Sequence, residues 1–313
     1  MDKNFKSVIY SLVGILAIML ILVLVLGNML GIARFQTDQA TLGMRLGFMF
    51  VGLLAVYVVY SFTKTSPAWE VGTRQVVWMA IGAALYAVFS WFFNVTVFVV
   101  PSLSQVALRP AIAIPMFFGY AFGPVVGLFT GAVGNTFGDA LTGFGLFPQW
   151  SMGNGLVGFV AGLPMLFGDK KRSLDTVLWL GGALALVGAV LYFLNRNQSN
   201  LMFFDPPNNV FGDAQITLFS GVSILVGFVL VAVVRFVFGQ NIDMAAAVTW
   251  GMLGNIVGIG FAAISDIWIN GYSLVAAIVG EFLPAAGPNM IFAAVLVPLL
   301  VVAYGSVQRQ SGR

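Results

Sequence analysis

Residues 109–143 read RPAIAIPMFFGYAFGPVVGLFTGAVGNTFGDALTG, and this stretch decides the fold class. Arg109 and Asp139 are its only charged residues, and glycine recurs at every fourth position from 119 to 131. Glycines at this spacing lie on one helix face and let a neighbouring backbone approach closely in lipid. Proline favours the first turn of a helix, so Gly123-Pro124 separates two helices. The stretch therefore predicts a tight helical hairpin inside a membrane.

The composition of the whole chain agrees with this interpretation. Of its 313 residues, 60% are hydrophobic and 8% are charged, whereas soluble domains carry about 25% charged residues. The mean hydropathy of +0.99 excludes a soluble enzyme, a disordered chain and a nucleic-acid-binding protein. What remains is an integral membrane protein embedded in a lipid bilayer.

The residues that are missing limit the chemistry. The chain has no cysteine and no histidine, which excludes thiolate or Ser-His catalysis and metal sites built from these ligands. None of its lysines follows a glycine, so a phosphate-binding Gly-Lys-Ser/Thr loop is absent. We therefore expect no enzyme activity, no cofactor and no metal, and any uphill transport must draw on an ion gradient or a partner.

Apolar segments set the number of membrane crossings, because a span needs about 20 apolar residues. Residues 271–284 are apolar but short, and could form a re-entrant or interfacial segment. The sequence otherwise predicts an all-α polytopic bundle of about ten transmembrane helices, at residues 8–32, 42–62, 76–97, 110–122, 124–142, 152–168, 176–194, 216–238, 245–264 and 288–304.

Charge and composition then predict orientation and organisation. With the N-terminus inside, inner segments hold ten Lys and Arg residues and outer segments four, so both termini are expected to be cytoplasmic and residues 195–215 outside. Three parts are expected: a two-helix N-terminal extension, a Gly- and Asn-rich core, and a plainer inserted helix pair. Their predicted bounds are 1–74, 75–168 with 244–306, and 173–240.

Polar residues inside membrane helices are costly and are functional candidates by default. Asn135 and Asp139 lie near the outer end of one hairpin helix, and Arg109 begins the other. Arg109 and Asp139 could therefore form a structural ion pair or contact a substrate; the sequence leaves both alternatives open.

The outer connection at residues 142–154, TGFGLFPQWSMGN, is uncharged and contains Gln149, Trp150 and Asn154. An aromatic face beside amides suits a small planar ligand that is uncharged or weakly charged. Two other interpretations stay open: Trp150 belongs to the interfacial aromatic belt, and Asn154 caps a helix.

The last region adds polar residues expected near the same cavity. Asn255 lies in the middle of a span, where it could instead bond another helix. Asp266 is expected on the outer connection, as is Glu281, and Asn289 at a helix start. The sequence thus predicts an outward-facing substrate site formed by Arg109, Asn135, Asp139, Gln149, Trp150, Asn154, Asn255, Glu281 and Asn289.

The third span carries two pairs of alanines at four-residue spacing, Ala80 with Ala84 and Ala83 with Ala87. Small residues at this spacing pack helices within a chain or between chains.

Three stretches resemble the substrate-binding S components of energy-coupling factor (ECF) transporters. They are residues 109–143, WSMGNGLVGFVAGLPM at 150–165, and the closing segment at 250–304, from Trp250 through GEFLPAAGPNMIFAAVLVPLLVVAY. The resemblance implies a six-helix core, built here from the third to sixth, ninth and tenth spans. It also implies a subunit of a prokaryotic plasma membrane that binds a vitamin or a related micronutrient.

The resemblance implies partners as well: a transmembrane coupling subunit and two ABC ATPases. The four alanines fall where the family's first helix has its A-x-x-x-A motif, and are expected to form the coupling-subunit interface. Two other functions stay open. An ion-coupled secondary transporter acting alone would need a titrating carboxylate such as Asp139 or Glu281. A membrane enzyme or assembly factor is the third alternative.

Overall fold

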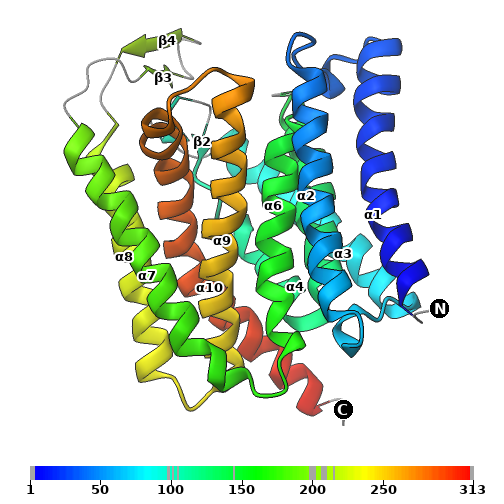
Figure 1. The fold of residues 1–313 in the computed structure, drawn as a ribbon, viewed down its shortest axis with the longest axis vertical. Coiled ribbons are helices and arrows are strands. Elements are labelled where there is room, and N and C mark those ends of the chain that lie inside the picture. The colour runs from blue at the N-terminus through cyan, green and yellow to red at the C-terminus, as the bar shows by residue number, and fades with distance from the viewer. Residues whose placement is uncertain are drawn as a thin grey trace.

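The structure, a computed structural model, describes residues 4–96, 99–100, 102–103, 106–143, 145–196, 202–205, 210–213 and 216–310. Its helices run along one long axis, and both chain termini lie toward the same end of the bundle (Figure 1). Two short antiparallel hairpins lie toward the opposite end. They pair β1 (Val99–Val100) with β2 (Val106–Ala107), and β3 (Met202–Asp205) with β4 (Val210–Asp213).

Helices account for most of the described residues, which confirms the predicted helical membrane bundle. Short 3-10 turns lie at η2 (Ala33–Phe35), η3 (Pro67–Trp69), η4 (Pro110–Ile112) and η5 (Leu163–Leu166). The longer elements are α1 (Phe5–Leu20) with the π-helix η1 (Ile21–Met29), α2 (Leu42–Thr63), α3 (Thr73–Thr96), α4 (Ala113–Phe122), α5 (Pro124–Thr142), α6 (Pro148–Gly162), α7 (Lys170–Asn195), α8 (Leu218–Val237), α9 (Ile242–Ile269), the π-helix η6 (Ala276–Phe282) and α10 (Leu283–Gln310).

Seven helices in the described part of the chain are long and apolar enough to cross a membrane. Each of the ten predicted spans overlaps a helix, but α4 has 10 residues and α6 has 15. At about 1.5 Å of rise per residue, neither covers a hydrocarbon core of about 30 Å alone. The predicted number of ten is therefore approximate.

The short apolar segment at 271–284 is largely helical, and its place relative to the membrane stays a prediction. Helical structure begins at residue 274, and η6 continues without a break into α10. The prediction that Asn289 begins a helix after Pro288 is therefore wrong, because both residues lie inside α10. A membrane helix tolerates an internal proline when neighbouring groups satisfy the backbone atoms that it releases.

The α4–α5 hairpin forms as the sequence predicts. Gly123 turns the chain with a φ of 114°, and Pro124 begins α5. A Cβ atom on Gly119 or Gly127 would collide with the carbonyl oxygen of Gly158 on α6. The predicted glycine face thus brings the backbones of three helices into contact.

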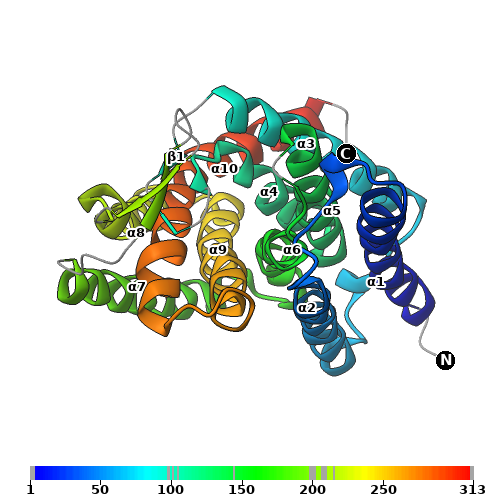
Figure 2. The same cartoon turned by 90° about the horizontal axis from the view of Figure 1, so that it is seen from above.

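The other helices flank this central group. Figure 2 shows α7 and α8 on one side and α1 and α2 toward the other, with α4, α5, α6 and α9 between them. This arrangement is compatible with an extension, a core and an inserted pair, and the division at residues 74, 168 and 244 stays a prediction.

Most of the described Lys and Arg residues lie at the end of the bundle that holds the termini, which we call the basic end. We call the opposite end, with β1–β4, the hairpin end. Lys3, Arg313 and part of residues 195–215 lie outside the described residues. The basic end has Lys6, Lys64, Arg74, Lys170, Lys171, Arg172, Arg235 and Arg309, and the hairpin end has Arg34, Arg45, Arg109 and Arg196. This separation agrees with the charge bias, and a cytoplasmic basic end stays a prediction.

Candidate functional site

A first cluster of buried polar residues joins the start of α4 to α5 and α6 near the hairpin end. Arg109 donates through Nη1 to Asn135 Oδ1, and its Nη2 lies 3.6 Å from Asp139 Oδ1. Asn135 Nδ2 donates to Asp139 Oδ2 at 2.8 Å and to Ser151 Oγ at 3.2 Å. The helical hairpin of α4 and α5 therefore brings Arg109 and Asp139 together as an ion pair, and Asn135 bridges them.

Asn154 lies in the interior of α6, so it does not cap the helix. Its Oδ1 accepts a hydrogen bond of 2.6 Å from the hydroxyl of Tyr86 on α3, and its Nδ2 donates to the carbonyl of Trp150. Sequence reasoning missed Tyr86 and Ser151. The signal for Tyr86 was its phenolic hydroxyl within an apolar span, because a buried hydroxyl requires a partner.

A second cluster centres on Asp266, which the sequence placed on a connection and left out of the site. The structure places it inside α9, where 1% of its surface is exposed. Gln149 Nε2 donates to Asp266 Oδ1 at 3.1 Å, and Trp150 Nε1 donates to Oδ2 at 2.8 Å. The indole N–H of Trp150 thus points into the protein rather than toward a membrane interface. A carboxylate at the end of an apolar run was the available signal for Asp266.

Glu281 lies in the π-helix η6 and is fully buried, at 0% exposure. The sequence placed it on a connection; the structure places it in a helix beside the second cluster, where it interacts with Asp266. Short π-helical segments occur frequently at functional sites. Buried Gln149, Asp266 and Glu281 therefore form one group at the hairpin end with half-buried Trp150, and this group has two carboxylates.

A third pair lies between α9 and α10. Asn289 Nδ2 donates to Asn255 Oδ1 at 3.2 Å, and Asn255 Nδ2 donates to the carbonyl of Ala286 at 2.8 Å. These bonds join two helices, which is the alternative that the sequence left open for Asn255. The structure therefore separates Asn255 and Asn289 from the hydrogen bonds of the first two clusters.

The four alanines of α3 face in two directions. Ala83 and Ala87 are buried against α5, where a Cβ on Gly134 would lie 2.9 Å from the carbonyl of Ala83. Ala80 and Ala84 are exposed on the outside of the bundle. Ala83 and Ala87 are therefore not accessible to a partner, and the interface predicted on α3 reduces to Ala80 and Ala84.

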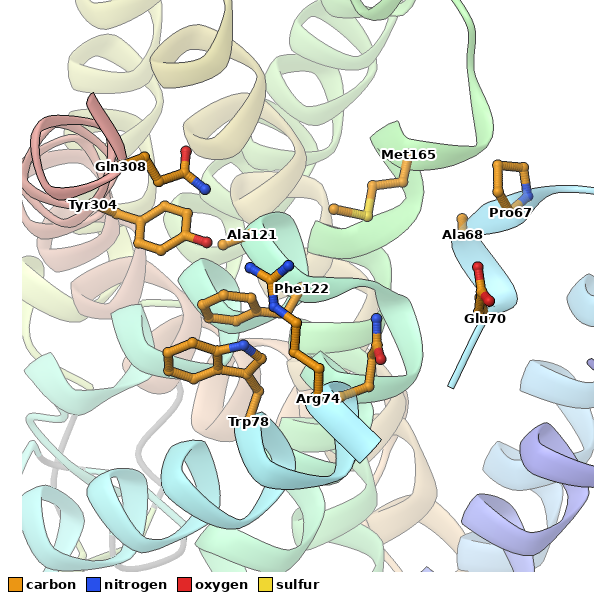
Figure 3. Close-up of a pocket in the computed structure, with 11 residues that line it drawn as sticks. Pro67, Ala68, Glu70, Arg74, Trp78, Ala121, Phe122, Met165, Tyr304 and Gln308 are labelled. Atoms are coloured by element: carbon orange, nitrogen blue, oxygen red, sulfur yellow. The ribbon is translucent and has the colours of Figure 1, made fainter. Parts of the chain in front are cut away.

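A cavity of about 310 Å³ lies at the basic end, away from the polar clusters (Figure 3). Its aromatic floor is Trp78 stacked on Phe122, with ring centroids 4.2 Å apart, and Tyr304 packs edge-on against Phe122. Glu70 and Arg74 contribute charged side chains. Sequence reasoning missed this cavity, because its walls come from elements distant in the chain, η3, α3, α4, η5 and α10.

Comparison with known proteins gives consistent matches. A family model described as "ECF-type riboflavin transporter, S component" matches residues 70–195. A UPF0397 protein of Vibrio atlanticus (strain LGP32) is 31% identical over 175 residues, which is 54% of this chain and 92% of that protein. A UPF0397 protein of Aliivibrio salmonicida (strain LFI1238) is 30% identical over 168 residues, covering 51% and 87%. No solved structure gives a significant match.

The matched region contains the α4–α5 hairpin and the polar start of α6. It extends through α7, beyond the boundary at 168 that the sequence suggested for the core. Almost the whole Vibrio protein aligns with about half of this chain. The chain therefore belongs with the UPF0397 proteins to the S-component family of ECF transporters, multi-pass subunits of the plasma membrane that are not enzymes.

Proposed function

We propose that this chain captures a vitamin or a related small micronutrient outside the cell and delivers it inward with a transmembrane coupling subunit and two ABC ATPases. The observation that carries the proposal is the buried network at the hairpin end, where the first turn of α6 donates two hydrogen bonds to Asp266. Buried polar groups of this density in a membrane protein mark a substrate path more often than simple packing. The lack of a Gly-Lys-Ser/Thr loop supports a separate ATPase.

The chemistry of this network favours a neutral, planar ligand. Its three carboxylates, Asp139, Asp266 and Glu281, outnumber the nearby arginines Arg109 and Arg45, which disfavours an anionic ligand. Trp150 offers an aromatic surface beside the amides of Gln149 and Asn154. Pockets for small molecules combine such apolar walls with a few oriented polar groups. A flavin, the substrate class in the description of the matching family model, has this chemistry and is a reasonable first candidate.

The ligand is best identified by mass spectrometry of small molecules that co-purify with the detergent-extracted protein. Trp150→Ala and Asn154→Ala are each expected to weaken binding of that molecule about ten- to hundredfold, because each removes a desolvated contact. Trp179→Ala is the matched control, since Trp179 is 61% exposed on α7. Wild-type affinity in both test variants, with unchanged thermal stability, would remove these residues from the site.

The exposed pair on α3 gives a second expected result. Ala80→Leu should lower substrate uptake by cells that contain the coupling subunit and ATPases, because the added bulk separates surfaces that must approach closely. Ligand affinity of the isolated chain should stay unchanged. Ala183→Leu is the control, since Ala183 is exposed on α7. An equal loss of uptake and affinity in Ala80→Leu would indicate internal packing instead of docking.

An ion-coupled transporter acting alone is the second candidate, and the burial of Glu281 on a π-helix favours it. Uptake that a protonophore abolishes while ATP depletion leaves it intact would support this candidate and contradict an ATPase-driven importer.

A further inference from the structure

Arg45 is a buried arginine from the N-terminal extension, which precedes the matched residues 70–195. Its exposed fraction is 5%. Apart from the adjacent pair Gly52 and Leu53, the buried residues of α2 recur at intervals of three or four, which defines one packing face. They are Arg45, Met49, Gly52, Leu53, Val56 and Tyr60. Arg45 is therefore on the side of α2 that packs against the bundle.

Two helices of the bundle receive this face. Gly52 allows close approach to α6, because a Cβ there would collide with the side chain of Met152. Phe48 packs against Phe261 and Trp268 of α9, with ring centroids 6.4 and 5.6 Å away. The contacts direct the first turn of α2 toward the ends of α6 and α9 that hold the second polar cluster.

Arg45 contacts Phe147, which lies two residues before the second cluster in the chain, and it interacts electrostatically with the two carboxylates of that cluster. Its Nε donates to Thr41 Oγ1 at 2.8 Å, and its guanidinium lies 5.2 Å from the ring centroid of Phe147. Its charge acts on both Asp266 and Glu281. Its Nη1 is buried and has no hydrogen-bond acceptor among the residues that the structure describes.

The charge of Arg45 matters because two carboxylates of the second cluster need a nearby cation. Asp266 and Glu281 place two carboxylates in one buried group, and buried charges are costly unless they are compensated. Arg109, a half-buried arginine near the hairpin end, pairs with Asp139. Among the residues that the structure describes, Arg45 is thus the cation that acts on the second cluster, and it comes from outside the matched region.

A backbone contact ties the extension to the same cluster. The N–H of Leu146 donates to the carbonyl of Gln36 at 2.8 Å. Gly145 has a φ of 85°, and a Cβ on it would lie 2.9 Å from that carbonyl. The loop before α2 therefore lies directly on the connection that leads into Gln149 and Trp150.

We infer that the N-terminal extension completes the polar site at the hairpin end, with Arg45 as a positioning residue that balances Asp266 and Glu281 and holds the start of α6. The inference rests on the proposed function only in treating Gln149 and Trp150 as substrate contacts. The extension then contributes residues to the site and does not merely pack against the six-helix core.

The test is a double-mutant cycle on the full chain without added ligand, so its outcome is separate from whether a substrate is found. Arg45→Gln should lower the melting temperature by about 5 °C or more, because it leaves buried carboxylates uncompensated. Adding Glu281→Gln should restore part of this loss, and Arg45→Lys should lie between wild type and Arg45→Gln. Arg34→Gln, at an exposed arginine of the same extension, is the control and should change nothing.

Hydrogen exchange tests the positioning role. The amide of Leu146 should exchange faster in Arg45→Gln than in wild type, and at the wild-type rate in Arg34→Gln. Additive effects in the cycle would overturn the charge balance, and unchanged protection of Leu146 would overturn the positioning role.

Discussion

Replacing Gly158 with alanine is expected to destabilise the protein by about 3 kcal/mol, although it adds a single methyl group. The new Cβ would collide with the carbonyl of Gly127, and it would also lie 2.9 Å from the Cα of Gly127. Both obstacles are backbone atoms, which cannot rotate away as a flexible side chain does. Helices α5 and α6 would therefore have to separate along the glycine face.

The measurement is the melting temperature and the yield of monodisperse protein in detergent. Gly47→Ala is the matched control, because Gly47 is an exposed helical glycine of α2 and a Cβ there meets nothing within 4 Å. That variant should be neutral or slightly more stable, since alanine lowers the entropy of the unfolded chain. Equal stability of the two variants would show that close backbone contact does not hold this core together.

Replacing Arg109 with methionine is expected to cost about 3–5 kcal/mol, because it leaves Asp139 buried without its cation. Asp139 is 5% exposed, and among the described residues Asn135 would remain as its donor. The double variant Arg109→Met, Asp139→Asn removes both charges and should regain much of the lost stability.

Thermal unfolding of the single and double variants checks this expectation. Arg74→Met serves as the control, because Arg74 is an exposed arginine at the basic end of α3. If Asp139→Asn gave no recovery in the Arg109→Met protein, the pair would not be energetically coupled. Ligand binding by the stable double variant then distinguishes the two alternatives that the sequence left open. Unchanged affinity would indicate a structural ion pair, and lost affinity would indicate a substrate contact.

The class of protein and its central motif follow from the sequence alone. Scarce charges and long apolar segments require a membrane bundle, and they are local properties that need no knowledge of contacts. Glycine at every fourth position and the Gly123-Pro124 break are also local, because helix periodicity alone places them on one face. The hairpin and its close packing could therefore be predicted.

Only the tertiary structure decided how the polar residues group. It joined Asn154 to Tyr86, moved Asp266 from a connection into α9, and paired Asn255 with Asn289. It also divided the alanines of α3 into buried and exposed pairs and placed Arg45 beside the second cluster. Each of these results depends on the rotation and depth of helices that are distant in sequence, and those are fixed by the packing of the whole bundle, which no single segment encodes.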